Sequence, residues 1–331
     1  MATRRIEEVV ERISNLRDAP SAEAIPALAK ALADRVNVVV AKAAEIAGER
    51  QLRELVSGLL TAFDRLFERA AERDPQCWGK VALARALRDL EYRQAAPFLR
   101  GARHVQLEAV WGGREDTAQT LRGTCLLALM ACTDITRAEL FRCLVDGLTE
   151  KESVVRTEAV RGLAELDGDE AALLLRMKAR VGDEEPRILG QVFDALWKVE
   201  GERAIAFVAP FLEAPADAVR EEAALALGAS RFAAAVGILR DALDRGRHPQ
   251  FREVLLRALS LTRQPAALDF LLGLVKTGRM ADAEAALDAL ALHRENQEIR
   301  RLAQEAAKGR EELRQKFERS FPNEPLVPAD R

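Results

Sequence analysis

The residues with the clearest potential to bind a ligand lie in one short stretch of the chain. Trp111 is followed by Gly112, Gly113 and Arg114, and Arg122 comes soon afterwards. Tryptophan is enriched at interface centres, and backbone N–H groups at a helix start can hold a carboxylate or phosphate. We interpret the stretch as a candidate partner-binding loop that could also hold a small anion. In the alternative interpretation, Trp111 tucks under the loop and the glycines only permit the turn.

No other set of residues predicts a catalytic or metal site. The histidines are scattered without metal-ligand spacing: His104, His248 and His293. The cysteines form no C-x-x-C pair, and we expect them to be reduced and mostly buried: Cys77, Cys125, Cys132 and Cys143. Nucleophile-elbow, P-loop and dinucleotide-binding signatures are absent. We therefore expect no metal, no cofactor and no enzymatic activity.

Charge and hydropathy limit the classes of partner. The chain has 50 basic and 53 acidic residues, a formal net charge of −3. Because nucleic-acid binding usually needs a basic excess, this balance argues against a nucleic-acid partner. The sequence has no apolar run of about 18 residues, so no membrane span is expected. It starts without the apolar stretch of a signal peptide, which predicts a cytoplasmic protein.

The elements that carry these residues are predicted to be helices in a repeat. Aromatic residues make up only 5% of the chain, and alternating strand patterns are nearly absent. A pattern of Val-Arg, then Ala, then an apolar anchor recurs, with 31–34 residues between anchors in the second half. The anchors are Ala47, Leu87, Leu129, Leu163, Leu196, Leu227, Leu259 and Leu290. Each copy predicts two helices joined by a turn, and such a unit must stack on its neighbours.

The pattern resembles the HEAT repeats, in particular those of bacterial HEAT-repeat proteins. Prolines fall inside the predicted first helices, at Pro26, Pro97 and Pro210. Asp34 and Asp217 precede second helices, where we expect them to cap the N-terminus. The resemblance implies that turn aspartates and helix arginines form ladders between repeats, a structural role for Asp217 and Arg220. It covers residues 22–292 and implies an all-α, right-handed α-solenoid of about eight hairpins.

The predicted organisation has four parts. Residues 1–21 form an N-terminal capping helix, and residues 22–292 form the solenoid, with an insertion near 101–116. Residues 293–319 form one charged C-terminal capping helix. Residues 320–331 carry three prolines and are expected to be a flexible tail.

We predict that the second helices build a concave surface that binds a protein partner. The residue five positions after each Arg slot should face away from the core: Glu45, Arg85, Leu127, Arg161, Asp194, Leu225, Arg257 and Asp288. We add Arg161 and Arg257 from this set to the candidate partner-binding residues. The set has mixed charge, so it forms no basic track for DNA.

Two further functions are compatible with HEAT-like repeats. DNA glycosylases of this type hold damaged DNA in a basic groove, but the Trp-Trp-Asp cluster that they carry is missing. Phycobilin lyases of this type attach pigments to proteins, and the repeat alone does not separate such a subunit from a scaffold.

Overall fold

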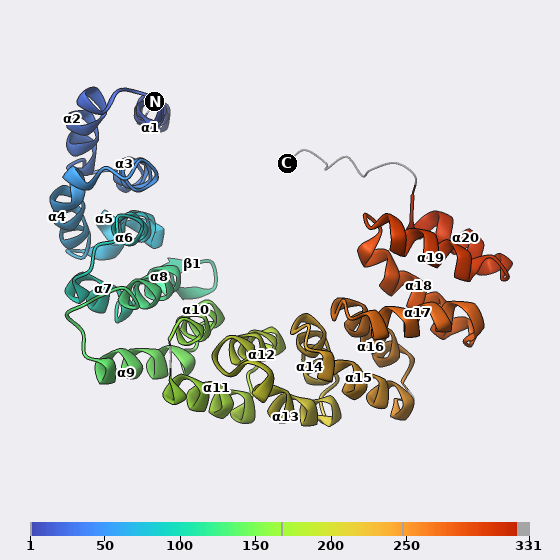
Figure 1. Cartoon of the computed structure of the whole chain (residues 1–331). Coiled ribbons are helices and arrows are strands. Elements are labelled where there is room, and N and C mark those ends of the chain that lie inside the picture. The colour runs from blue at the N-terminus through green and yellow to red at the C-terminus, as the bar shows by residue number, and fades with distance from the viewer. Residues whose placement is uncertain (1, 167, 247, 323–331) are drawn as a thin grey trace. The chain divides into compact units, whose positions relative to one another are not determined.

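The computed structural model describes residues 2–166, 168–246 and 248–322 (Figure 1). The chain divides into two compact units, unit 1 (Met1–Asp167) and unit 2 (Gly168–Arg331). Each unit is a stack of antiparallel helical hairpins in which the second helices lie side by side on one face. Across the described residues, none of the helices combines the length and apolar character needed to cross a membrane.

Unit 1 begins with a single helix and continues with four hairpins, α2/α3, α4/α6, α7/α8 and α9/α10. Its elements are α1 (Ala2–Ser14), α2 (Ser21–Leu32), α3 (Asn37–Glu49), α4 (Val56–Leu66), α5 (Ala70–Arg73), α6 (Trp78–Asp89), α7 (Ala95–Ala102), β1 (Leu107–Val110), β2 (Gly113–Asp116), α8 (Gln119–Leu129), α9 (Arg137–Leu148) and α10 (Ser153–Ala164). Short 3₁₀ turns at Asn15–Arg17, Arg53–Leu55 and Pro75–Cys77 complete the unit.

Unit 2 contains five hairpins, α11/α12, α13/α14, α15/α16, α17/α18 and α19/α20. Its helices are α11 (Asp169–Val181), α12 (Pro186–Glu200), α13 (Ile205–Val208), α14 (Asp217–Ala229), α15 (Ala233–Arg245), α16 (Pro249–Leu261), α17 (Pro265–Thr277), α18 (Met280–Leu290), α19 (Gln297–Ala307) and α20 (Glu311–Ser320). Its 3₁₀ turns are η4 (Gly201–Ala204), η5 (Ala209–Glu213) and η6 (Ala291–His293). Pro210 lies in η5, so the first helix of this hairpin is broken where a proline removes a backbone donor.

The predicted all-α solenoid of stacked hairpins is confirmed. All eight anchor residues from Ala47 to Leu290 are fully buried, and each lies on the second helix of its hairpin. Small residues let these helices approach closely, because a side chain on Gly228 of α14 would collide with the carbonyl of Ala258 in α16. Because the second helices stack side by side in each unit, their exposed residues form rows on one face of that unit.

The turn aspartates do not cap the second helices as predicted. Asp34 instead accepts from the backbone N–H of Val36, two residues on, and Asp217 is paired with Arg220 inside its own helix. The helix arginines contact the previous turn: Arg220 Nη1 donates to the carbonyl of Ala214 at 2.9 Å. The expected ladder occurs at other residues, since Arg252 of α16 forms a two-point ion pair with Asp282 of α18 at 2.9 Å.

The C-terminal end differs from the prediction. The single capping helix expected over 293–319 is a hairpin, α19/α20, whose helices are separated at Arg310. From the turn between α19 and α20, the guanidinium of Arg310 reaches the turn between α17 and α18, where it donates to the carbonyl of Gly278 at 2.9 Å. The expected tail also begins later, because Phe321 is buried and stacks on Phe317 at 4.6 Å between ring centroids. The rest of the predicted tail, residues 323–331, lies outside the described residues.

A buried ion pair fastens three hairpins of unit 1 together. The side chains of Asp74 and Lys80 are fully buried and lie 3.0 Å apart. Asp74 Oδ1 also accepts from Asn37 Nδ2 of α3 at 2.9 Å, and its backbone carbonyl accepts from Gln106 Nε2 at 2.8 Å. Lys80 Nζ donates to the carbonyl of Leu66 at 3.3 Å. The backbone N–H groups of Gly79 and Lys80 also donate to this carboxylate, at 2.7 Å and 2.9 Å, so the pair has no spare acceptor for a ligand.

Replacing Lys80 with methionine should lower the free energy of unfolding by about 3–5 kcal/mol, because Asp74 would remain as a buried charge without its cation. Urea unfolding followed by circular dichroism measures the change. Lys308→Met is the matched control, since Lys308 forms an exposed ion pair with Glu305 and its loss should leave stability nearly unchanged. Equal effects of the two substitutions would show that the buried pair does not fasten unit 1.

Candidate functional site

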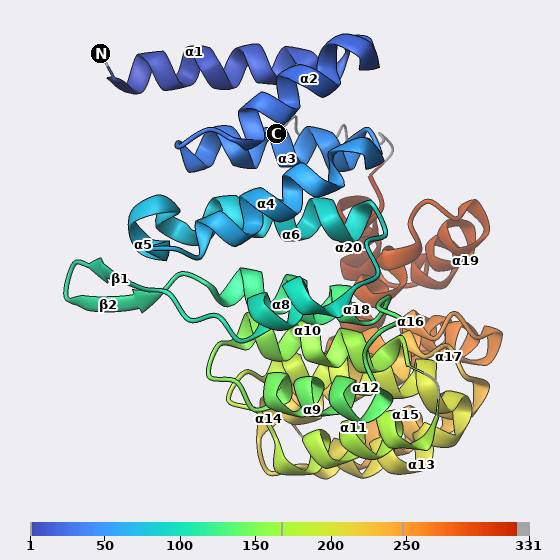
Figure 2. The same ribbon diagram turned by 90° about the vertical axis from the view of Figure 1, so that its left-hand side faces the viewer.

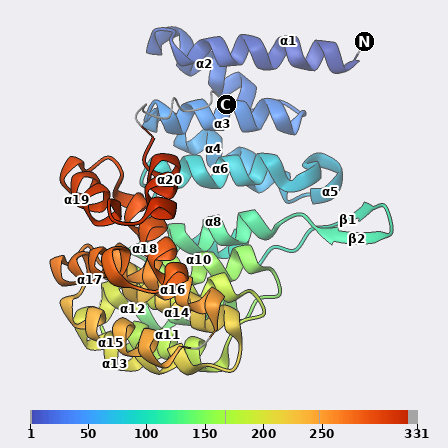
Figure 3. The same cartoon turned by 90° about the vertical axis from the view of Figure 1, so that its right-hand side faces the viewer.

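The predicted insertion is a two-stranded β-hairpin, called the arm below, formed by residues 107–116. Figures 2 and 3 show the arm extending from the helices of unit 1. Leu107 pairs with Asp116 at its base, and Val110 pairs with Gly113 at its tip. Gly112 has φ = +94°, a conformation that side chains disfavour, so a glycine is needed at this corner. Trp111 stands beside it and is fully exposed, so the interpretation in which Trp111 tucks under the loop is wrong.

The base of the arm is held by a carboxylate that sequence reasoning did not single out. Glu108 Oε1 accepts from the backbone N–H of Gln76 at 2.8 Å. It also accepts from Gln106 Nε2 and from Thr117 Oγ1, both at 2.7 Å. Partial desolvation raises the pKa of Glu108, but the hydrogen bonds outweigh it and lower the pKa below its usual value. The carboxylate therefore stays ionised and fixes the direction of the arm.

Arg122 is not available to an external anion. Its side chain is buried, and Nη1 donates to Asp116 Oδ2 at 2.5 Å and to the carbonyl of His104 at 3.0 Å. Glu150 lies 3.3 Å from its Nε. The predicted anion site at this helix start thus loses its second cation, because Asp116 already occupies the position expected for the ligand. Arg114 is exposed on β2, and within the described residues it has no carboxylate partner.

The other two predicted arginines lie in different units. Arg161 of α10 is in unit 1, where it is exposed and bonds Glu158 on the same helix at 3.0 Å. Arg257 of α16 is in unit 2, where it lines a groove between the second helices. The structure therefore does not show the seven predicted binding residues as one site, and Arg257 belongs to a surface of different character.

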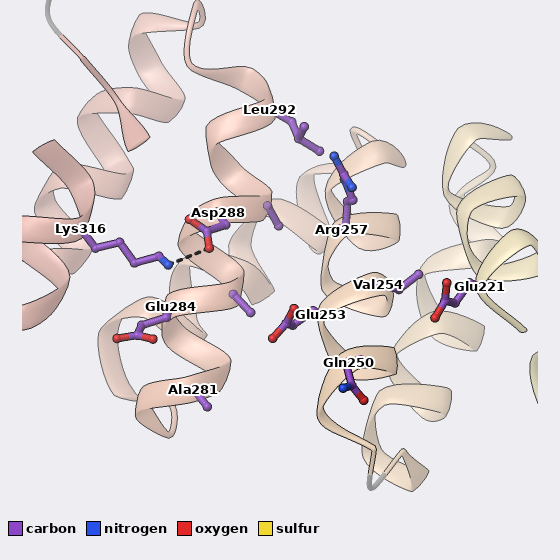
Figure 4. Close-up of a pocket in the computed structure, with 12 residues that line it drawn as sticks. Glu221, Gln250, Glu253, Val254, Arg257, Ala281, Glu284, Asp288, Leu292 and Lys316 are labelled. Atoms are coloured by element: carbon purple, nitrogen blue, oxygen red, sulfur yellow. Dashed lines mark ion pairs between the residues drawn. The ribbon is translucent and has the colours of Figure 1, made fainter. Parts of the chain in front are cut away.

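This surface, called the acidic groove below, runs across the second helices of unit 2. One hollow of about 550 Å³ lies between α14, α16, α18 and α20 (Figure 4). The polar lining consists of Glu221, Gln250, Glu253, Arg257, Glu284, Asp288 and Lys316. The apolar lining consists of Val254, Ala281, Ala285, Ala289 and Leu292. Figure 4 shows that the charged side chains come from all four helices.

The groove continues along the same face toward α12. A second hollow of about 420 Å³ shares Arg257 and Leu292 with the first and adds Arg187, Asp194, Glu222 and Leu225. Burial raises the pKa of Asp194, and burial together with the nearby Asp194 charge raises the pKa of Glu222. Glu222 packs against Gly190, where any side chain would meet its carboxylate. Two carboxylates, Asp194 and Glu222, therefore share this end of the groove with two cations, Arg187 and Arg257.

Negative charge exceeds positive charge over the whole groove. Six carboxylates face three cations: Asp194, Glu221, Glu222, Glu253, Glu284 and Asp288 against Arg187, Arg257 and Lys316. Lys316 is already paired with Asp288 at 2.7 Å. Among the described residues, Arg257 has no ion pair. A ligand that brings positive charge and apolar surface would complement this lining.

Sequence position predicted part of the groove. The positions expected to face away from the core in unit 2, namely Asp194, Leu225, Arg257 and Asp288, all line it. The reasoning missed Glu221, Glu253 and Glu284, which lie four residues earlier on the same helices. Because residues four apart share a helix face, the same periodicity could have identified them. Because only one exposed position was considered on each second helix, the excess of acidic over basic residues on this face was not predicted.

The stacked hairpins define a helical-repeat protein. The family model of HEAT repeats matches residues 142–227 and 207–291. Residues 142–291 of the chain are therefore HEAT repeats. No curated protein matches it significantly.

One similar solved structure is human deoxyhypusine hydroxylase in complex with glycerol. The identity is 17%, the match covers 89% of this chain and 99% of that one, and the TM-score is 0.25. This likeness is too distant to transfer an activity. It does correct the expectation that the chain is not an enzyme, because an enzyme is among the proteins that this fold resembles. Within the described residues, no group of three or more His, Cys, Asp or Glu side chains is placed to hold a metal ion.

Trp111→Ala should change the free energy of unfolding by less than about 1 kcal/mol, because the indole makes no buried packing contact. The matched control is Phe98→Ala on α7, where a fully buried ring is removed and about 3–5 kcal/mol should be lost. Chemical denaturation of both variants measures the difference. A loss of comparable size at Trp111 would show that the indole packs against the protein.

Proposed function

We propose that the chain is a protein-binding scaffold whose acidic groove holds a basic, partly apolar segment of a partner protein. The observation that carries the proposal is the lining of the groove. Carboxylates from α12, α14, α16 and α18 converge on an apolar floor, and only three cations offset them. A partner segment with Lys or Arg next to Leu or Val side chains fits such a lining.

The apolar floor and the carboxylates contribute in different ways. Burying Val254 and Leu292 under a partner side chain removes apolar surface from water, which supplies affinity. Carboxylates such as Glu253 and Glu284 attract a basic segment and fix its direction. They raise the association rate and the specificity more than the affinity. Arg257 lies between the two parts of the groove and can receive one acidic group of the partner. The groove thus favours a mainly basic segment that carries one carboxylate.

The same charges oppose nucleic acid. A phosphate backbone would meet carboxylates on α12, α14, α16 and α18, whereas nucleic-acid grooves are lined by Lys and Arg. The groove therefore supports a protein partner over the glycosylase-like alternative, in agreement with the charge balance of the chain.

Neutralising the groove should weaken binding of a basic peptide. We propose to measure a labelled 12-residue peptide of alternating Arg and Leu by fluorescence anisotropy. Glu253→Gln combined with Glu284→Gln should raise its dissociation constant about tenfold. The matched control, Asp241→Asn with Asp244→Asn, removes the same charge from exposed positions of α15 and should leave the affinity unchanged. An alternating Glu and Leu peptide should not bind.

Equal losses in the two double variants would indicate general charge attraction and contradict the groove. A photo-crosslinker placed at Val254 then locates the peptide independently. If excess unlabelled peptide does not reduce crosslinking at this position, the proposal is also contradicted.

Asp194→Asn should stabilise the protein slightly at neutral pH, by less than about 1 kcal/mol because the side chain remains accessible to water. The pKa of Asp194 is raised by burial, so its charged form opposes folding above that pKa. The gain should disappear as the pH falls through the raised pKa and wild-type Asp194 becomes protonated. Thermal unfolding at several pH values measures it, with Asp241→Asn as control. A gain that persists at acid pH would exclude this cause.

A further inference from the structure

The outer edge of β1 presents unpaired backbone groups. The backbone N–H of Thr117 donates to the carbonyl of Gln106 at 2.9 Å, and the register then places Glu108 and Val110 in the bonded pairs of the ladder. In an antiparallel pair the alternating residues, Leu107 and Ala109, direct their N–H and C=O groups away from the partner strand. Within the described part of the chain, no hydrogen bond outside the arm uses these groups. Such an edge is a template for another strand.

Apolar side chains accompany this edge. Leu107 is 50% exposed, and Trp111 at the tip is 103% exposed relative to a free residue. Leu107 and Ala109 share one face of the strand because side chains alternate along it. A two-stranded hairpin is only marginally stable in water and gains from a third strand on its edge. The arm therefore carries both the backbone groups and the apolar surface that strand addition requires.

We propose that β1 pairs with β1 of a second copy of this chain, antiparallel, about a twofold axis at Ala109. This register places Leu107 of each copy next to Trp111, the turn residue that follows β1, of the other. Each end of the pairing then carries one aliphatic–aromatic contact, a favourable cross-strand combination. The small side chain of Ala109 meets itself on the axis. The interface is isologous, so it closes as a dimer.

The charges of the arm select this edge and this register. On the β2 edge, an axis at Arg114 would place two guanidinium groups opposite each other, and an axis at Glu115 would oppose two carboxylates. On the β1 edge, an axis at Glu108 would likewise oppose two carboxylates. An axis at Val110 would leave Leu107 without a strand opposite it. Only the axis at Ala109 avoids like charges while covering the apolar side chains.

The arm is prepared for this pairing by its anchored base. Glu108 is held by hydrogen bonds from Gln76, Gln106 and Thr117, so the strand is already extended before a partner arrives. A preorganised strand loses little conformational freedom on binding. The arm belongs to unit 1 and the acidic groove to unit 2, so the pairing does not rest on the proposed function. If both occur, a dimer carries two grooves and can hold a two-site partner by avidity.

Sedimentation velocity of the full chain tests the proposal. The interface is small, so we expect the dimer to form over about 10–100 µM. Ala109→Pro should abolish it, because proline removes the N–H that faces away from β2 and leaves the ladder of the arm intact. The matched control, Arg114→Pro, removes the corresponding N–H on the opposite edge and should leave the dimer in place. Trp111→Ala should raise the dimer dissociation constant about tenfold.

Disulfide trapping covers the case in which either proline disrupts the arm. The twofold axis brings the two Cα atoms of residue 109 to about 5.5 Å, a distance that a disulfide spans. Under mild oxidation, Ala109→Cys should give a covalent dimer and Arg114→Cys should not; Cys77, Cys125 and Cys143 are buried. A wild-type protein that stays monomeric throughout the range would overturn the proposal. So would a dimer that survives Ala109→Pro, or equal trapping at both positions.

Discussion

Close packing of the second helices is the constraint on which the rest of the structure depends. A single hairpin exposes an apolar face that only the next hairpin can cover, so each repeat must dock on its neighbour. Gly48 of α3 approaches Ala86 of α6 so closely that an added Cβ would lie 3.1 Å from its Cα. Gly228 and Ala258 repeat this contact in unit 2. The spacing of the repeats, and hence of the side chains on the exposed face, follows from these approaches.

Polar side chains secure the turns once the helices are packed. Arginines such as Arg220 and Arg310 place their guanidinium groups on carbonyls that helix ends leave without partners. Some of these arginines also pair with a carboxylate of a second helix, as Arg252 does with Asp282. Other carboxylates of the second helices in unit 2 lie on the exposed face, where Glu253 and Glu284 line the groove.

The sequence could predict the elements whose physics is local and periodic. Buried anchors such as Leu163 and Leu259 recur at nearly constant spacing, and helix periodicity placed Arg257 and Asp288 on the exposed face. The arm could not be predicted in this way. Its strands are four residues long, and its base is anchored by Gln76, which is more than thirty positions earlier in the chain. Arg122 shows the same limit, because only the folded chain brings Asp116 and Glu150 to its guanidinium.

The arm is an insertion whose ordering costs conformational entropy. Ordering a residue costs about 1–2 kcal/mol in backbone entropy, and an exposed hairpin tip recovers little of this by packing. The anchored base offsets part of the cost: Gln106 and Glu108 tie the arm to Asp74 and Gln76, and Asp74 is itself neutralised by Lys80. The buried ion pair thus does more than hold three hairpins together. Through the hydrogen bond from Gln106 to Asp74 it also supports the base of the arm, from which β1 extends.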